Sequence, residues 1–390
     1  MPSPSSHDPD APPEAAVAVR GLCEPRYAAV RDAFAANFRE RGEVGASVCV
    51  IVDGRVVVDL VGGWADAART IEWRPDTLVN LYSVGKAFVA LLALRSVARG
   101  AIALDDPVAS AWPEFGAGGK SAVSLRHALC HRAGVPAIRE RLSDDDLLDW
   151  DRMTSALAAT EPWWEPGTRH AYHTNTYGHL VGEVVRRTTG VRPGAALREL
   201  AASCDADLWC GLPDDQLGRC AEVLWEPPAG RGWIDPWPLE GDARMIALGY
   251  FNPPGYSSVG LVNEARWRRA QVPSTNAHGT AAGIARFYAA LLEPGRLLPA
   301  DLLAEATRPQ SDGFCPVLGE EVVFGLGFKP TTPRRPLGPN PRAFGHYGTG
   351  GSLGFADPDA RVAFGYAMNH VIPRWQSTRN RALVEALYRC

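Results

Sequence analysis

The sequence predicts an α/β (α+β) protein. One antiparallel sheet flanked by helices is built from both ends of the chain, and a mostly helical part is inserted between them. Three observations predict this class: an amphipathic helix and a β-hairpin at the start, a mostly helical middle, and short strands with one more helix at the end. With the helical part inserted, the first and last strands are expected to share one sheet.

The N-terminal elements follow from their periodicity. Ala, Val and Phe recur at helical spacing over 26–39, and two runs rich in β-branched residues follow, over 46–52 and 56–60. Asp53-Gly54 between these runs is typical of a tight hairpin turn. An apolar helix then begins at Ser83, runs to about residue 98 and is closed by Gly100.

The rest of the chain is divided in the same way. The segment 226–254 holds six prolines and two tryptophans without periodicity, so we expect a long structured loop there. The other predicted elements are helices over 124–130, 150–159, 176–188, 280–292 and 376–388, and strands over 322–327, 344–347 and 362–368. The expected units are a disordered segment over 1–15, an α/β domain over 16–100 and 270–390, and a mostly helical domain over 101–269.

Composition and charge exclude several classes of function. The chain has 46% hydrophobic and 22% charged residues and a net charge of −4, so neither nucleic acid nor a membrane is an expected partner. The first residues lack the basic and apolar pattern of a leader. Eight cysteines without regular spacing, and no His/Cys cluster with zinc-ligand spacing, favour reduced thiols in the cytoplasm and no metal or cofactor.

One serine–lysine pair stands out against the basic composition. Three of the 40 basic residues are lysines, and the others are arginines, which keep their proton near neutral pH. Lys86 follows Ser83 by three positions at the start of the apolar helix. On a first helical turn the two side chains share a face, with Cβ atoms roughly 5–6 Å apart. A lysine whose pKa is lowered by burial can therefore accept the serine proton.

Two further motifs carry groups suited to acyl transfer. Tyr172 follows Pro166-Gly-Thr-Arg, and a phenol between a serine and an ammonium can act as a base and then return the proton to a leaving group. The glycine-rich run from Phe344 to Gly354 lets a strand edge approach an acyl group, and a backbone N–H there, with that of Ser83, can form an oxyanion hole. Taken alone, Tyr172 also fits a loop cap, and the run fits a turn between strands.

Together these motifs resemble a known superfamily. Ser83-x-x-Lys86, Tyr172 and His346-Tyr-Gly348 stand in the order and at roughly the separations of the serine β-lactamases and penicillin-binding proteins. Within this superfamily the chain is most similar to the class C β-lactamase-like esterases, the family VIII carboxylesterases. The resemblance implies a β-lactamase/transpeptidase-like fold with the active site in a cleft between two domains.

The resemblance also implies a role for each matching residue. Ser83 is expected to be the nucleophile, Lys86 its activator, and Tyr172 the general base for acylation and for attack of water on the acyl-enzyme. The backbone N–H groups of Ser83 and Thr349 are expected to form the oxyanion hole. Further substrate contacts are expected from residues around these motifs and from two tryptophans that suit an apolar wall: His173, Thr174, Trp233, Trp237, His346, Gly348 and Gly350.

Two departures from the superfamily bear on the substrate. Many β-lactamases have Tyr-x-Asn where this chain has Tyr172-His173-Thr174, and Lys-Thr-Gly where it has His346-Tyr-Gly348. The first change removes an amide that holds the β-lactam side chain, and the second removes a permanent cation that binds a carboxylate. Both changes favour a neutral short-chain ester, with weak β-lactam hydrolysis as a side activity.

Other residues fit competing interpretations. Gly350-Gly-Ser352-Leu-Gly354 matches the nucleophile elbow of α/β-hydrolases, but the residues after it predict a turn and a strand instead of the required helix. His131, His173 and His278 are candidate bases in a Ser–His scheme, although each fits a structural histidine better. The acidic run at 144–146 fits a solvated helix start better than a metal site.

The chain is therefore predicted to be a cytoplasmic serine carboxylesterase that acts on a small-molecule ester through a Ser83 acyl-enzyme. An acyltransferase to a small acceptor shares every catalytic residue. A β-lactamase or a D-amino-acid amidase uses the same groups on another bond. A structural or assembly protein on this fold is the alternative outside catalysis, and intact Ser83, Lys86 and Tyr172 argue against it.

Overall fold

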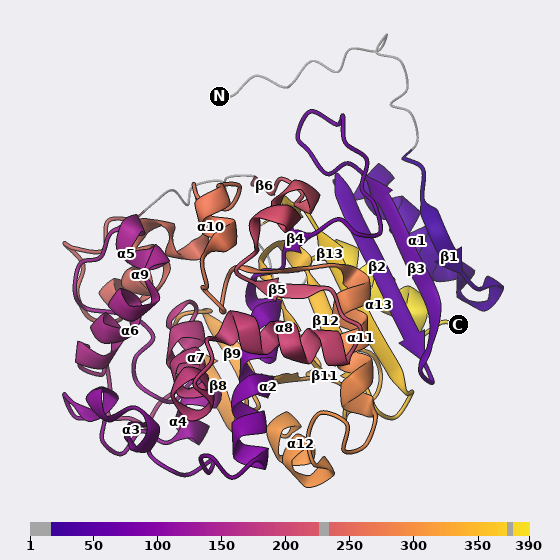
Figure 1. Ribbon diagram of the computed structural model, residues 1–390. Coiled ribbons are helices and arrows are strands. Elements are labelled where there is room, and N and C mark those ends of the chain that lie inside the picture. The colour runs from indigo at the N-terminus through magenta and orange to yellow at the C-terminus, as the bar shows by residue number, and fades with distance from the viewer. Residues whose placement is uncertain (1–16, 226–233, 373–376) are drawn as a thin grey trace.

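A seven-stranded antiparallel sheet forms the centre of the computed structural model, which describes residues 17–225, 234–372 and 377–390 (Figure 1). Its strand order is β1-β3-β2-β13-β12-β11-β10, so strands from both ends of the chain lie side by side. The junction is between β2 and β13, where Val48 pairs with Tyr366. The strands are β1 (Arg20–Cys23), β2 (Gly45–Val52), β3 (Arg55–Gly63), β10 (Lys329–Pro330), β11 (Phe344–Tyr347), β12 (Leu353–Asp357) and β13 (Val362–Met368).

Helices cover both faces of this sheet (Figure 1). On one face α11 (Ala281–Leu292) packs closely, because a Cβ on Gly365 of β13 would lie 2.1 Å from the Ala281 carbonyl oxygen. The next residue, Tyr366, points to the other face, where its hydroxyl bonds to Glu43. That face is covered by α1 (Ala28–Glu40) and α13 (Thr378–Leu387), which pack together.

A long buried helix, α2 (Gly85–Ala98), packs against α7 and α8 in the helical part of the molecule (Figure 1). Its first ten residues are buried on every side, which explains its apolar sequence. The other helices are α3 (Val108–Ala111), α4 (Leu125–Leu129), α5 (Asp144–Leu148), α6 (Trp150–Ala159), α7 (Thr176–Thr189), α8 (Pro193–Ser203), α9 (Gly241–Phe251), α10 (Ala265–Arg269) and α12 (Ala300–Thr307).

Small sheets complete the structure around α2. A three-stranded sheet is formed by β4 (Val79–Asn80), β7 (Ala277–Gly279) and β5 (Leu208–Cys210), and β4 precedes the short turn that leads into α2. A hairpin pairs β8 (Ser311–Cys315) with β9 (Glu320–Phe324), and a parallel pair joins β14 (His370–Val371) to β6 (Leu224–Trp225). The β8–β9 hairpin lies next to β10 and so extends the structure beyond one edge of the central sheet.

The predicted loop over 226–254 is wrong in its second half, where α9 forms. The prolines lie on either side of this helix and not inside it, and Met245 and Leu248 form a buried face three residues apart. The first part of the predicted loop, over 226–233, and the predicted disordered segment lie outside the described residues. The division into domains at about residues 100 and 270 stays a prediction.

Candidate active site

The turn that leads into α2 holds Ser83 in a constrained backbone. β4 is followed by the short 3-10 helix η2 (Tyr82–Val84) and then by α2. Tyr82 has φ 53°, a left-handed conformation that is costly for a bulky residue. Burial of its ring, edge-to-face against Trp225 at 6.0 Å between centroids, stabilises this conformation. The constrained turn therefore presents Ser83 in η2, two residues before Gly85, the first residue of α2.

Lys86 lies in the first turn of α2 with its nitrogen surrounded by three oxygens. Nζ is 3.1 Å from Ser83 Oγ, 2.6 Å from the carbonyl oxygen of Thr174 and 3.1 Å from that of Ser274. Burial, with the positive charge of Lys329 nearby, holds the pKa of Lys86 well below its usual value. A neutral amine has two N–H donors, which the two carbonyls accept, and one lone pair, which is left for the Ser83 hydroxyl. This geometry suits proton transfer from Ser83 to Lys86.

Tyr172 brings a phenol from the segment between α6 and α7 to the same place. Its buried ring stacks on Phe324 of β9 at 5.9 Å between centroids, and Lys86 Nζ lies 4.8 Å from the ring centroid. Burial raises the pKa of Tyr172 well above its usual value, and the nearby Ser83 hydroxyl opposes part of that rise. The structure thus brings together the hydroxyl, the amine and the phenol that were predicted from separate motifs.

His346 of β11 lies next to this phenol. Its ring stacks on the Tyr172 ring at 6.5 Å between centroids, and its Nδ1 donates to the Tyr347 carbonyl at 2.8 Å. Burial, with Lys329 and Lys86 nearby, holds the pKa of His346 well below the ordinary histidine value. The ring is therefore neutral at neutral pH and supplies no permanent positive charge.

A glycine turn, η6 (Thr349–Gly351), carries the predicted second oxyanion donor, Thr349. Gly350 has φ 86° and Gly351 has φ 119°, conformations that favour glycine. The turn is held from α13, because Arg379 Nη2 donates to the Gly350 carbonyl at 3.0 Å and Asn380 Nδ2 donates to the Gly351 carbonyl at 2.8 Å. These bonds fix the peptide groups that follow Thr349.

Ser352, which matches the nucleophile-elbow pattern, has a structural role. It is fully buried, and its Oγ donates to the Leu81 carbonyl at 2.9 Å. Strand β12 follows it where an elbow requires a helix. A Cβ on Gly348 would lie 2.0 Å from Ser352 Oγ and 2.4 Å from the Leu81 carbonyl oxygen, so glycine is needed there. The Ser352 bond ties the η6 turn to the backbone just before Ser83.

Known proteins resemble this chain along most of its length. The Beta-lactamase family model matches residues 30–388. The chain belongs to the beta-lactamase family. It is 33% identical over 378 residues to the esterase/beta-lactamase LipL of Mycobacterium tuberculosis, a match that covers 94% of this chain and 86% of that protein. Esterase EstB of Burkholderia gladioli is 30% identical over 311 residues, with 74% and 75% covered.

Two solved structures of similar proteins share the fold of this beta-lactamase family member. A family VIII carboxylesterase is 39% identical with a TM-score of 0.88, covering 96% of this chain and 100% of that chain. A penicillin-binding protein homologue from Caulobacter crescentus is 38% identical with a TM-score of 0.87, covering 95% and 99%. These findings confirm the predicted family, the β-lactamase/transpeptidase-like fold and the predicted serine carboxylesterase activity.

His173, predicted to contact substrate, is bonded to the backbone. It is fully buried, its Nε2 accepts from the Val135 N–H at 3.2 Å, and its Nδ1 donates to the Ala171 carbonyl at 2.7 Å. Both ring nitrogens of His173 are therefore engaged with the backbone, and its contact with substrate stays a prediction. Substrate contact by the neighbouring Thr174 stays a prediction. Its carbonyl accepts a hydrogen bond from Lys86, and its Oγ1 has no hydrogen-bond partner among the described residues.

His131 and His278, the two other candidate bases, each have a ring nitrogen bonded to the backbone. His131 Nδ1 accepts from the His173 N–H at 3.2 Å and His278 Nδ1 donates to a backbone carbonyl at 2.7 Å, contacts that fit structural histidines. Trp233 lies outside the described residues. The guanidinium of Arg141 lies 4.6 Å from the ring centroid of Trp237. Contact of Trp237 with substrate stays a prediction.

Two buried groups near the site are not among the predicted residues. Lys329 of β10 places Nζ 5.3 Å from the centroid of the Tyr172 ring. The low lysine count that singles out Lys86 also singles out Lys329, so a signal existed in the sequence. The second group is the ion pair of Arg379 and Glu43 behind η6, at 2.8 Å. These two residues lie 336 positions apart, and no local pattern marks them.

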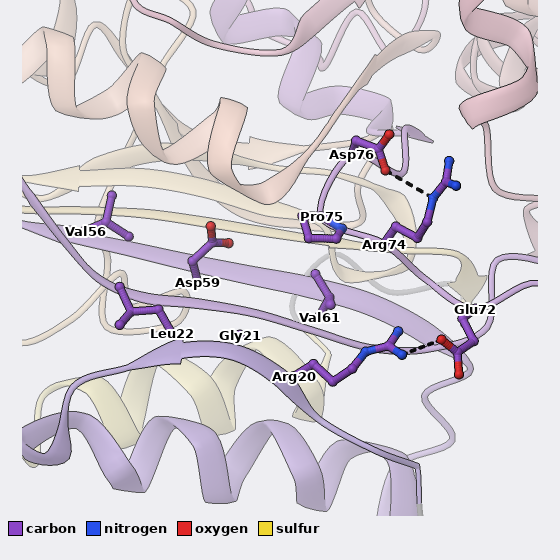
Figure 2. A pocket seen from close by; sticks show the side chains of 10 residues that line it. All are labelled: Arg20, Gly21, Leu22, Val56, Asp59, Val61, Glu72, Arg74, Pro75 and Asp76. Atoms are coloured by element: carbon purple, nitrogen blue, oxygen red, sulfur yellow. Dashed lines mark hydrogen bonds and ion pairs between the residues drawn. The ribbon is translucent and has the colours of Figure 1, made fainter.

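A surface cavity of about 730 Å³ lies away from this site, over β1, β3 and the segment 72–76 (Figure 2). The ion pairs of Arg20 with Glu72 and of Arg74 with Asp76 border it, and none of its lining residues is a predicted site residue. Across the described ranges, no three His, Cys, Asp or Glu side chains are grouped to hold a metal ion. Nor does any helix in those ranges have the length and apolarity to cross a membrane.

Proposed function

We propose that this enzyme hydrolyses small carboxylic esters through an acyl-enzyme on Ser83. The observation that carries the proposal is the position of the Lys86 amine: its Nζ lies 3.1 Å from Ser83 Oγ and 4.8 Å from the centroid of the Tyr172 ring. Two of the relatives are named as esterases and one as a family VIII carboxylesterase, which supports an ester as the substrate class.

In acylation, Ser83 Oγ attacks the ester carbonyl carbon while its proton passes to the Lys86–Tyr172 pair. Tyr172 is the general base, and the neutral Lys86 amine takes up the extra proton of the pair and holds the serine in place. The backbone N–H groups of Ser83 and Thr349 stabilise the negative charge on the carbonyl oxygen. The C–O bond of the ester then breaks, and Tyr172 returns the proton to the leaving alcohol.

Deacylation uses the same groups in the reverse order. Tyr172 accepts a proton from water, whose oxygen attacks the acyl carbonyl carbon of the Ser83 ester. The tetrahedral intermediate then releases the carboxylic acid, and Ser83 Oγ recovers a proton from Tyr172. The enzyme returns to its starting state without a metal or an organic cofactor in the scheme.

A neutral acyl group fits this site best. His346 is held neutral, so the third motif has no permanent cation for a carboxylate. Weak β-lactam hydrolysis is included in the proposal, since one relative is named for both activities. Transfer to an alcohol or amine needs no different residue, but the esterase names of the relatives do not favour it.

We also place the enzyme in the cytoplasm. All eight cysteines, which lie within the described ranges, are held as thiols. Five of them are buried, where they act as small apolar residues. A reducing compartment suits this thiol content.

Labelling with a fluorophosphonate tests the nucleophile and the enzyme class together. The protein is treated with the reagent, weighed intact by mass spectrometry and digested to map the labelled peptide. We expect one adduct, on Ser83, and none in Ser83→Ala. Ser352→Ala is the matched control and should label like the wild type. An adduct on another serine, or no adduct, would falsify the proposal.

A further inference from the structure

Two of the three lysines of this chain flank one phenol. Lys86 Nζ lies 4.8 Å and Lys329 Nζ 5.3 Å from the centroid of the Tyr172 ring. The third lysine, Lys120, donates to the carbonyls of Ala117 and Thr160 and has no part in this site. Elsewhere the chain uses arginine for positive charge.

The fold places Lys329 at the phenol from a third direction. Its strand β10 pairs with β11, with Lys329 opposite Gly345, next to the strand position of His346. The side chain is buried, and its ammonium lies 4.8 Å from the Phe324 ring centroid as well as close to Tyr172. Since Phe324 and Tyr172 stack, the cation lies against both rings of one aromatic pair.

Positive charge predominates among the titratable groups around Lys329. Burial and, to a smaller extent, Arg335 lower its pKa, and Cys315 and Glu320 raise it, with the result that the pKa is about 7. Glu320 is itself paired with Arg334 and Arg335, which reduces its effect.

The charge of Lys329 also acts on the other groups that surround the phenol. It lowers the pKa of Lys86, of His346 and of His131, each of which is buried. Its position therefore favours the neutral form of three neighbouring bases.

We propose that Lys329 is a positioning residue for ester hydrolysis, whose ammonium stabilises the phenolate of Tyr172 and keeps Lys86 neutral. The inference rests on the proposed function. Lys329 acts through these two side chains and not on the ester itself. Both effects favour the form of the Lys86–Tyr172 pair that can accept the Ser83 proton. The role of Lys329 consumes no net proton or electron.

The test removes the positive charge of Lys329 by substitution and measures how kcat/KM depends on pH. Lys329→Met and Lys329→Gln are compared with wild type for kcat/KM on p-nitrophenyl acetate, at the isosbestic wavelength of nitrophenol, from about pH 5 to about pH 9. Without the cation, the pKa of Tyr172 and that of Lys86 both rise, so the ascending limb moves to higher pH. We expect the ascending limb to shift by about one pH unit, which corresponds to about tenfold lower kcat/KM on the acidic side.

The profiles should converge above neutral pH, because wild-type Lys329 loses its own proton with a pKa of about 7. Lys329→Arg, which keeps the cation, should retain the acidic limb. A drop by the same factor at every pH, or an unshifted limb in a neutral variant, would overturn the inference. Variants are compared where thermal unfolding matches wild type, and the glutamine variant, which keeps a polar head group, serves if the methionine variant unfolds.

Two controls separate this inference from the proposed function. Lys120→Met removes a buried lysine away from the site and should leave the profile unshifted. Ser83→Ala should be inactive at every pH. Activity in Ser83→Ala would sink the proposed function, whereas an inactive Ser83→Ala with an unshifted Lys329→Met profile would sink the role of Lys329 alone.

Discussion

The Lys86 nitrogen lies 3.1 Å from the Ser83 hydroxyl oxygen, across the junction of η2 and α2. Both side chains are buried, so the contact is formed in the folded protein before any substrate binds. The carbonyls of Thr174 and Ser274 fix the amine from the other side. Preorganisation of this kind lowers the cost of reaching the transition state.

Loss of either reacting oxygen should abolish most of the activity. Ser83→Ala removes the nucleophile, and Tyr172→Phe removes the base while leaving its ring. Each should lower ester kcat by at least about 10³-fold, a loss of roughly 4 kcal/mol in transition-state stabilisation. Steady-state assays with a p-nitrophenyl ester measure this. Retention of most activity in either variant would contradict the assigned roles.

Ser352→Ala should lower the stability of the protein and leave its catalytic activity nearly unchanged. The Leu81 carbonyl would lose its 2.9 Å hydrogen bond in a buried setting, so the free energy of unfolding should fall by about 1–3 kcal/mol. Activity should stay within a few-fold of wild type. Urea unfolding and kcat are measured on the same preparation. An inactive but stably folded variant would reopen the α/β-hydrolase interpretation.

The ion pair behind η6 should matter far more than an ion pair at the surface. Arg379→Met leaves the buried Glu43 carboxylate without its cation and should lower the free energy of unfolding by about 3–5 kcal/mol. Arg389→Met removes the exposed contact with Glu385 and should change the free energy of unfolding by less than about 1 kcal/mol. Denaturant titration compares the two.

A double variant refines this prediction. Glu43→Leu combined with Arg379→Met removes both charges, so stability should partly return relative to Arg379→Met alone. The double variant should still lose activity, because the Gly350 carbonyl has lost its donor and the η6 turn is less well fixed. An Arg379→Met protein as stable as wild type would argue against the buried pair.

Stability should fall in mild acid because several histidines are buried as neutral rings. Burial lowers the pKa of His173 to about 4 and of His179 and His278 to about 3, from 6.5 in the unfolded chain. Between these values the unfolded chain binds more protons than the folded one. The free energy of unfolding should therefore decrease below pH 6.5 by about 1.4 kcal/mol per pH unit for each histidine.

Urea unfolding at about pH 7 and about pH 5 measures this slope. His278→Asn, which takes one titrating ring out of the core, should flatten it. Equal stability of the wild type at the two pH values would show that these histidines are not held neutral in the folded state.

Much of the fold follows from local sequence pattern. The spacing of apolar residues predicts α6, β11 and β13 with the bounds that the structure has. Short elements do not follow in the same way: β10 has two residues, too few for any periodicity, and its place depends on pairing with β11. In α9, prolines just outside the helix conceal a pattern that its buried face shows.

The site likewise contains residues that sequence motifs predict and residues that only tertiary packing brings there. Helical spacing predicts that Ser83 and Lys86 meet, and the resemblance to the serine β-lactamases implies that Tyr172 joins them. Lys329 reaches the phenol from the far edge of the sheet, and Arg379 reaches η6 from the last helix. Contacts of this kind depend on tertiary packing, which sequence spacing does not encode.

The pairing of β2 with β13 also has a consequence for synthesis on the ribosome. The β2–β3 hairpin leaves the exit tunnel long before β13, the other neighbour of β2 in the sheet, is translated. Until then one edge of β2 has no partner in the nascent chain and is open to wrong pairing with other chains. The serine emerges with the early part, and the glycine turn beside it with the late part, so a truncated translation product cannot hydrolyse anything.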